Sequence, residues 1–105
     1  MRDSIVQSIK GCFVCGSTGD LHIHHVFYGS ANRAKSDEDG CWVYLCPAHH
    51  NMSSNGVHFN HKLDTYVKKY TQKMWMEHYT DSEDSEDEKI DKFIKRYGRN
   101  YIEDD

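Results

Sequence analysis

Two pairs of metal-binding residues in this chain share the same spacing. Cys12 and Cys15 are separated by two residues, and so are Cys46 and His49. A two-residue spacer lets a tight turn or the start of a helix hold one ion with both side chains. Three thiolates and one imidazole form a tetrahedral ligand set that zinc favours. The spacing therefore predicts a structural Zn²⁺ site built from all four residues.

The alternative for these cysteines is a disulfide or a buried thiol. The first ten residues, MRDSIVQSIK, contain no long apolar stretch and no small-residue cleavage site, which argues against a secretory signal. No segment approaches the roughly 18 apolar residues that a membrane span requires. We therefore expect a cytoplasmic protein whose thiols stay reduced and bind metal. Cys41 has no partner at this spacing and is predicted to be a core or loop residue.

Four further histidines lie near the zinc pairs in sequence: His24, His25, His50 and His58. Adjacent residues of a strand face opposite sides, so His24 and His25 cannot both reach one metal without distortion. This favours one imidazole as a metal ligand and the other as a proton acceptor for water. A divalent ion beside such a base is suited to phosphodiester hydrolysis. The remaining histidines are predicted to be structural or at the surface: His22, His61 and His78.

The pattern of apolar residues predicts the elements that carry these side chains. Alternation over 21–26 and the β-prone run 42–45 predict two strands, and Pro47 suits the first turn of a helix. Apolar residues at three- and four-residue steps predict a longer helix over about 60–79. Two short strands and a helix among metal ligands indicate the α+β class, as a small ββα-metal core with helices after it. The other predictions are a short helix at 2–10 and a polar loop at 29–40.

Charge divides the chain into a near-neutral body and an acidic end. Residues 1–80 carry eight Lys and Arg against seven Asp and Glu, whereas the remaining residues carry five against ten. This balance neither supports nor excludes nucleic acid as a partner.

In a chain of 105 residues we predict a single main domain at 1–80, an acidic linker at 81–88, and a helix with its tail at 89–105. A capping box that begins at Ser85 and a stop signal at Gly98 bound that helix.

These motifs resemble the HNH (His-Me finger) nuclease family. The matching pieces are Cys12-x-x-Cys15, His24-His25-Val26 and Leu45-Cys46-Pro47-Ala48-His49-His50. The resemblance implies that His25 is a general base, and that His24 and His50 bind a catalytic metal ion, Mg²⁺ or Mn²⁺. It also implies that the substrate is DNA and that the reaction is hydrolysis of a phosphodiester bond.

The wider pattern HIHHVFYG…LCPAHHNMSSNGVHFN is also similar to small phage-encoded HNH proteins, which are similar in turn to Ref-type, RecA-dependent nucleases. This likeness implies that His58 is a further ligand of the catalytic metal. It implies phage DNA recombination or processing in the cytoplasm of a bacterial host, with a recombinase filament or another DNA-processing protein as partner. The chain departs from the family at Cys41, where the family has Asn. Either Asp39 or Asn51 holds the loop between the strands in its place, or the activity is reduced.

Contacts with DNA phosphates are predicted for basic residues near the histidines and on the long helix: Arg33, Lys35, Lys62 and Lys69, with Lys68 and Lys73 beside them. Two other functions stay open at this point. One is a zinc-stapled adaptor that binds DNA or protein and has lost catalysis, which Cys41 favours. The other is a protein that binds a host factor through its acidic segment, a function that gives the eight histidines no role. The sequence leaves the oligomeric state open.

Overall fold

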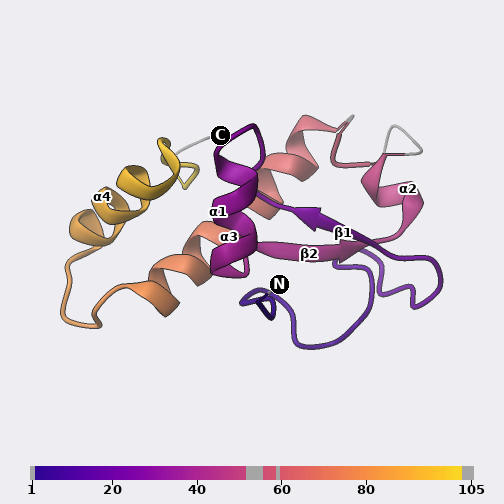
Figure 1. The fold of residues 1–105 in the computed structure, drawn as a ribbon, viewed down its shortest axis with the longest axis horizontal. Helices are drawn as coiled ribbons and strands as arrows, with labels where there is room; N and C mark the ends of the chain where they lie inside the picture. The colour runs from indigo at the N-terminus through magenta and orange to yellow at the C-terminus, as the bar shows by residue number, and fades with distance from the viewer. Residues whose placement is uncertain (1, 52–55, 59, 103–105) are drawn as a thin grey trace.

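The sheet consists of two antiparallel strands, β1 (His22–His25) and β2 (Trp42–Leu45), paired so that His24 lies opposite Val43. Both strands confirm the sequence prediction. Helix α2 (Pro47–His50) follows β2 directly, as the proline indicates. The computed structural model describes residues 2–51, 56–58 and 60–102. Within these residues the chain is a small α+β protein with one two-stranded sheet and four helices (Figure 1).

Helix α1 (Asn32–Asp39) lies between the two strands, so the polar loop predicted at 29–40 is wrong. The helix buries polar residues, Ser36 and Asp39, so it lacks the apolar periodicity that would reveal it in the sequence. It ends at Gly40, whose φ of 76° is a left-handed conformation that glycine adopts without strain. The connection between the strands is therefore a defined element that can position side chains.

Residues 2–10 run along β2 and form no helix, contrary to the short helix predicted there. The Ser4 hydroxyl donates to the carbonyl of Trp42 at 2.6 Å, and the Gln7 side-chain oxygen accepts from the backbone N–H of Tyr44 at 2.6 Å. These side chains satisfy backbone groups on the free edge of β2. These bonds to a strand 38 and 37 positions later hold the segment in a bent, non-helical path along β2.

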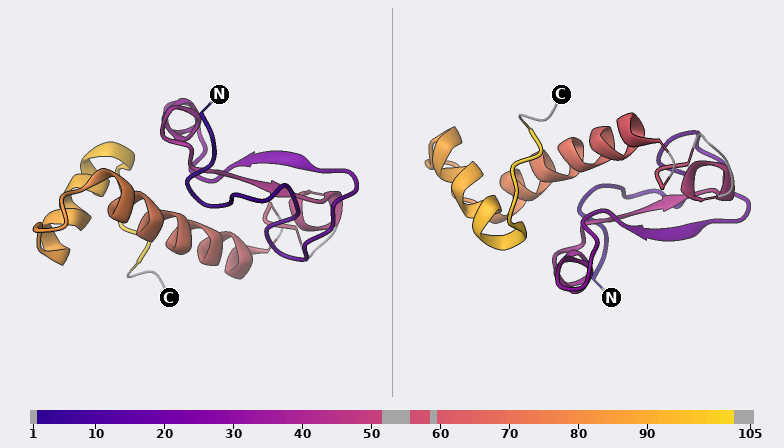
Figure 2. Two further views of the ribbon diagram at one scale, coloured as in Figure 1. Left: turned by 90° about the horizontal axis from the view of Figure 1, so that it is seen from below. Right: turned by 90° about the horizontal axis from the view of Figure 1, so that it is seen from above.

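Helix α3 (His61–Tyr79) confirms the long helix predicted over about 60–79. It begins at Asn60, whose side chain accepts a hydrogen bond from the backbone N–H of Leu63 at 3.1 Å. Figure 2 shows α3 running lengthwise beside the sheet, with α4 at its far end. Its inner face buries apolar and polar residues together, among them Val67 and Trp75.

Helix α4 (Glu86–Tyr97) begins inside the acidic segment 81–88, which is therefore only partly a linker. Ser85 and Glu88 form the predicted capping box, and the three acidic residues of the first turn face the positive end of the helix dipole. The helix ends at Gly98, as predicted, with φ of 87°. Residues 103–105 of the predicted tail lie outside the described residues.

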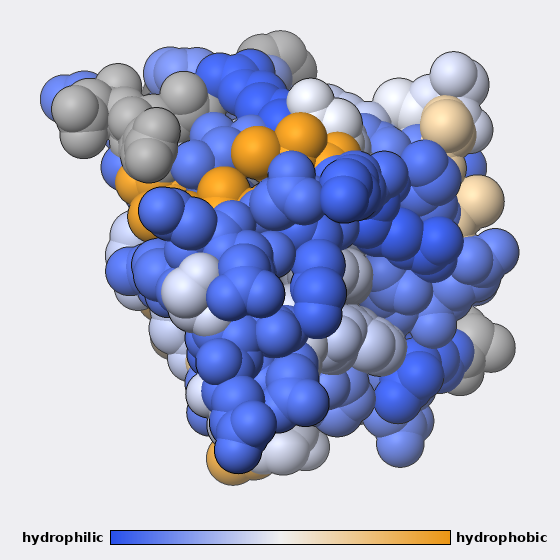
Figure 3. Space-filling view, turned by 90° about the vertical axis from the view of Figure 1, so that its left-hand side faces the viewer, coloured by the Kyte–Doolittle hydropathy of each residue, from blue (hydrophilic) through white to orange (hydrophobic). Residues whose placement is uncertain are grey.

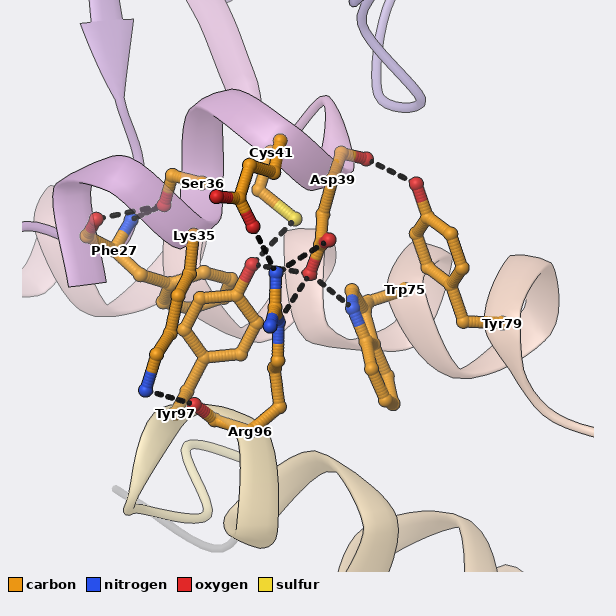
Figure 4. Close-up of polar contacts among 10 residues, drawn as sticks. Phe27, Lys35, Ser36, Asp39, Cys41, Trp75, Tyr79, Arg96 and Tyr97 are labelled. Atoms are coloured by element: carbon orange, nitrogen blue, oxygen red, sulfur yellow. Dashed lines mark hydrogen bonds and ion pairs between the residues drawn. The ribbon is translucent and has the colours of Figure 1, made fainter. Parts of the chain in front are cut away.

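A buried carboxylate connects α1, α3 and α4 (Figure 4). Asp39 is 9% exposed and accepts hydrogen bonds from Trp75 Nε1 at 2.9 Å and from the Tyr97 hydroxyl at 2.7 Å. Arg96 donates to both carboxylate oxygens, from Nε and Nη2, each at 3.0 Å. The aromatic rings of Phe27 and Tyr97 pack beside this network with centroids 4.6 Å apart. The carboxyl-terminal helix is thus anchored to the segment that joins the strands.

The surface at the α4 end is mostly hydrophilic, with a smaller group of apolar residues among the polar ones (Figure 3). None of the helices in the part of the chain that the structure describes has the length and apolar character needed to cross a membrane.

Candidate functional site

Cys12, Cys15, Cys46 and His49 lie together, with their ligand atoms all within 4.8 Å of one another. The Sγ atoms of Cys15 and Cys46 are 3.7 Å apart, and His49 Nδ1 is 3.3 Å from the Cys46 Sγ. A tetrahedral ion with Zn–S bonds of about 2.3 Å requires sulfurs about 3.8 Å apart. The donor set and its spacing therefore fit one zinc ion, as predicted. A disulfide does not fit, because its S–S bond is about 2.05 Å and all four cysteines of the chain are free.

The local backbone positions these ligands. Cys12 and Cys15 belong to a tight turn in which the Gly16 N–H donates to the Cys12 carbonyl at 2.8 Å. Burial opposes ionisation of the Cys12 thiol, but backbone hydrogen bonds from Cys46, Cys15 and Val14 outweigh it and lower its pKa to about 6. The thiolate is the form that binds zinc, so the turn prepares this ligand at neutral pH.

Cys41 is a different kind of cysteine, as the sequence predicts. It is fully buried, and burial raises the pKa of its thiol to about 12. Its sulfur lies 3.6 Å from the Tyr97 hydroxyl oxygen. Cys41 is therefore a core residue next to the Asp39 network.

A second cluster consists of His24 from β1, His50 from α2, and His58 from the segment before α3; their ligand atoms also lie within 4.8 Å of one another. His50 Nε2 is 3.2 Å from His58 Nε2. His24 is 3% exposed, and its Nε2 is buried without a hydrogen-bond partner among the described residues. Burial, with the nearby His50 and His58, lowers the pKa of His24 to about 3. A neutral imidazole with an unused buried nitrogen fits a metal ligand, since a bound ion would satisfy it.

His25 lines the same cavity of about 210 Å³ as His24, His50 and His58. The two adjacent histidines of β1 thus reach one site, although strand geometry predicts opposite sides; His25 is the last residue of the strand. Its Nε2 lies 3.1 Å from the Asp37 carboxylate of α1. In the neutral imidazole, a hydrogen bond to this carboxylate places the proton on Nε2 and leaves the Nδ1 lone pair free.

The sequence prediction missed Asp37 because it assigned 29–40 to a loop. It also missed His22, which was predicted to be structural or at the surface: His22 Nδ1 lies 2.9 Å from His50 Nδ1. The signal for His22 was present, since residues two apart on a strand share a face and His24 is two residues later. Of the other two histidines, His61 is exposed on α3, and His78 contacts Arg2 at 3.4 Å.

The basic residues predicted to contact DNA separate into three places. Arg33 lines the histidine cavity. The Lys35 ammonium donates to the carbonyl of Arg96 at 2.9 Å, so it joins α1 to α4 and does not face the cavity. Lys62 and Lys69 line a different hollow on α3.

Residues of α1 hold the connection between the two strands in place. The Ser36 hydroxyl donates to the Phe27 carbonyl at 2.7 Å and accepts from the Phe27 N–H at 3.1 Å. Asp39 anchors the end of the same helix through α3 and α4. Asp39 therefore braces this segment, whereas Asn51 is exposed after α2.

Comparisons of the chain with models of protein families, with curated proteins and with solved structures found no match. The function must therefore be argued from the two clusters, the cavity and the groups around them.

Proposed function

We propose that this chain is a metal-dependent DNA endonuclease with a ββα-metal site of the HNH type. The observation that carries the proposal is the convergence of three imidazoles, one with an unpaired buried nitrogen, in the cavity that also holds the His25–Asp37 pair. A ligand set and a separate base in one cavity are the two parts that hydrolysis of a phosphodiester requires. The Cys₃His cluster is the structural zinc site of this proposal.

His25 acts as the general base. Its Nδ1 takes a proton from a water molecule as the water oxygen attacks phosphorus; the bond from phosphorus to the 3′ oxygen breaks, and that oxygen takes a proton from solvent water. Asp37 fixes the tautomer through Nε2 and stabilises the imidazolium that forms, because the carboxylate gains a charged partner. We assign His24 to the metal instead, because its ring lies beside those of His50 and His58, with centroids 5.2 and 5.3 Å away.

His24, His50 and His58 would hold the second divalent ion. When bound, that ion would supply positive charge that stabilises the phosphate as negative charge develops on it. Among the described residues the group contains three imidazoles and no carboxylate. Mg²⁺ binds almost only oxygen ligands, whereas Mn²⁺, although it also suits carboxylates, accepts imidazole. Of the two ions that the resemblance implies, the donor set favours Mn²⁺.

Arg33 lines the cavity beside the histidines and is the basic residue best placed to meet the scissile phosphate. A guanidinium binds two phosphate oxygens at once and stays charged at all relevant pH values. Tyr28 lines the cavity too, and the ammonium of Lys68 lies over its ring, 4.3 Å from the centroid.

Nicking of supercoiled plasmid by the zinc-loaded protein tests the proposal. We expect nicking that depends on Mn²⁺ and that His25→Ala lowers by about 10²- to 10⁴-fold. His78→Ala is the matched control, because it removes an exposed imidazole near the end of α3, outside the cavity. Circular dichroism and zinc content establish that each variant is folded. A wild type that stays inert with Mn²⁺ on plasmid and on single strands, or nicking that survives His25→Ala, would overturn the proposal; inertness would favour the adaptor.

A further inference from the structure

The outer face of α3 carries a row of lysines with aromatic rings between them. Lys62, Tyr66, Lys69 and Lys73 follow one another at steps of four, three and four residues, which places them on one side of the helix. Tyr66 is the most exposed of the aromatic residues on this helix, with 58% of its surface accessible, and Tyr70 beside it is 37% exposed. Large aromatic rings are rarely left in water without a function when they occur in a group.

Tyr66 stands between two hollows. One, of about 350 Å³, is lined by Phe13 and Val14 of the zinc-binding turn and by Leu63 and Tyr70 of α3. The rings of Phe13 and Tyr70 lie 5.5 Å apart, so the zinc turn and the helix form this wall together. The hollow is therefore positioned by the zinc site as well as by α3.

The other hollow, of about 380 Å³, is lined by His61, Lys62, Thr65 and Lys69 on the far side of Tyr66. No carboxylate of the residues that the structure describes lines either hollow. Within the described residues neither Lys62 nor Lys69 has an ion-pair partner, in contrast to Lys68, which pairs with Asp64 at 2.9 Å. The lysine–tyrosine face (Lys62, Tyr66, Lys69 and Tyr70) thus offers two free positive charges beside two exposed ring faces.

We propose that the lysine–tyrosine face binds single-stranded DNA, with unpaired bases stacked on Tyr66 and Tyr70 and phosphates held by Lys62 and Lys69. Flat aromatic rings in a basic groove are how proteins bind single strands without sequence preference. A duplex keeps its base faces stacked inside the helix, so these rings have nothing to bind there. An apolar protein partner would leave both ammonium groups without counter-charges.

The inference rests on the proposed function, because it defines the substrate of that site. Helix α3 begins three residues after His58, so a strand that follows this face leads toward the histidine cavity. The nuclease would then act on single strands or on single-stranded regions next to a duplex.

Fluorescence anisotropy with a labelled oligodeoxythymidylate of about 12 nucleotides tests the inference. The full-length zinc-loaded protein is used without Mn²⁺, so that binding is measured without cleavage. We expect tighter binding to this strand than to a hairpin duplex, and an increase in Kd of about 5- to 100-fold for Tyr66→Ala. Tyr66→Phe keeps the ring and should bind as the wild type does. Lys69→Ala should flatten the dependence of log Kd on log salt by about 0.7.

Lys95→Ala is the matched control, since Lys95 is an exposed lysine on α4 that pairs with Asp91 at 2.9 Å. Equal binding of duplex and single strand, or an unchanged Kd for folded Tyr66→Ala, would overturn the inference. If the protein binds single strands through Tyr66 but does not nick DNA, the proposed nuclease function is refuted and the proposed binding face stands. A protein that nicks DNA while Tyr66→Ala binds normally would refute the binding face alone.

Discussion

Asp39→Asn should destabilise the protein far more than its small change in shape suggests. The carboxylate accepts four hydrogen bonds, two from Arg96 and one each from Trp75 and Tyr97. An amide can accept at only one of its two ends, so its NH₂ group meets a donor of one of these neighbours. The bonds that persist lose the assistance of the negative charge.

The magnitude follows from the surroundings of the pair. Breaking a buried ion pair costs about 3–5 kcal/mol. The Arg96 side chain is 33% exposed, so water compensates part of this, and we expect a loss of about 2–4 kcal/mol in the free energy of unfolding. Asp91→Asn is the control, because the Asp91–Lys95 pair is exposed on α4 and should contribute only about 0.3–0.5 kcal/mol.

Urea unfolding followed by circular dichroism, at saturating zinc, measures both variants. The free energy of unfolding of a small protein falls by about 1–3 kcal/mol per molar urea, so Asp39→Asn should lower the urea concentration at the unfolding midpoint by about 1 M or more. If Asp39→Asn lowers the urea midpoint no more than Asp91→Asn does, the reasoning is refuted, because the buried network would then contribute no more than a surface pair.

The same carboxylate predicts a dependence on pH. Burial raises the pKa of Asp39, but hydrogen bonds from Arg96, Tyr97 and Trp75 outweigh it, and the pKa lies below its usual 3.8. A lowered pKa in the folded state stabilises the protein above pH 3.8 and loses that contribution as pH falls through the folded value. The stability difference between wild type and Asp39→Asn should therefore be largest near neutral pH and shrink below about pH 4. Zinc release in acid affects both proteins, so their difference isolates Asp39.

Three further outcomes follow from the two clusters. Chelation of zinc or Cys12→Ser should abolish most of the helical circular dichroism. Cys41→Ser should leave the zinc content unchanged, because Cys41, unlike Cys12, lies outside the Cys₃His cluster. His22→Leu should weaken Mn²⁺ binding, measured by electron paramagnetic resonance, by about 10- to 100-fold. His22→Gln should retain the affinity, because its side-chain oxygen can accept the Nδ1–H of His50. Equal Mn²⁺ affinities for the two variants would refute this role of His22. Asp37→Asn should slow nicking by about tenfold or more and alter its pH profile, yet less severely than His25→Ala, and an unchanged profile would show that Asp37 does not orient the base.

The strands and the ligand pairs could be predicted because their signals are local. The two-residue spacing of Cys12 and Cys15, and of Cys46 and His49, predicts a metal site directly. The alternation of apolar and polar residues before His25 predicts a strand. The caps of α3 and α4 are local as well, since Ser85 and Glu88 bond within one turn. Signals of this kind need no knowledge of what the rest of the chain does.

Helix α1 and the amino-terminal segment could not be predicted because distant residues define them. Asp39 becomes a buried helical residue only when Arg96, 57 positions later, meets it. Gln7 stays outside any helix because its side chain bonds to Tyr44 of β2, 37 positions away. Asp37 could not be recognised as a partner of His25 until α1 was known, and so the candidate base came without the group that orients it.

Helix α2 contributes a ligand to each cluster, His49 to the zinc group and His50 to the histidine group. Its four residues, Pro47–His50, are too few to form a stable helix alone. Zinc at the Cys₃His cluster would therefore stabilise the element that presents His50. If the histidine cluster binds the second ion as proposed, the two binding free energies are coupled, so loss of zinc should weaken binding of the second ion and raise the concentration of that ion needed to fill its site.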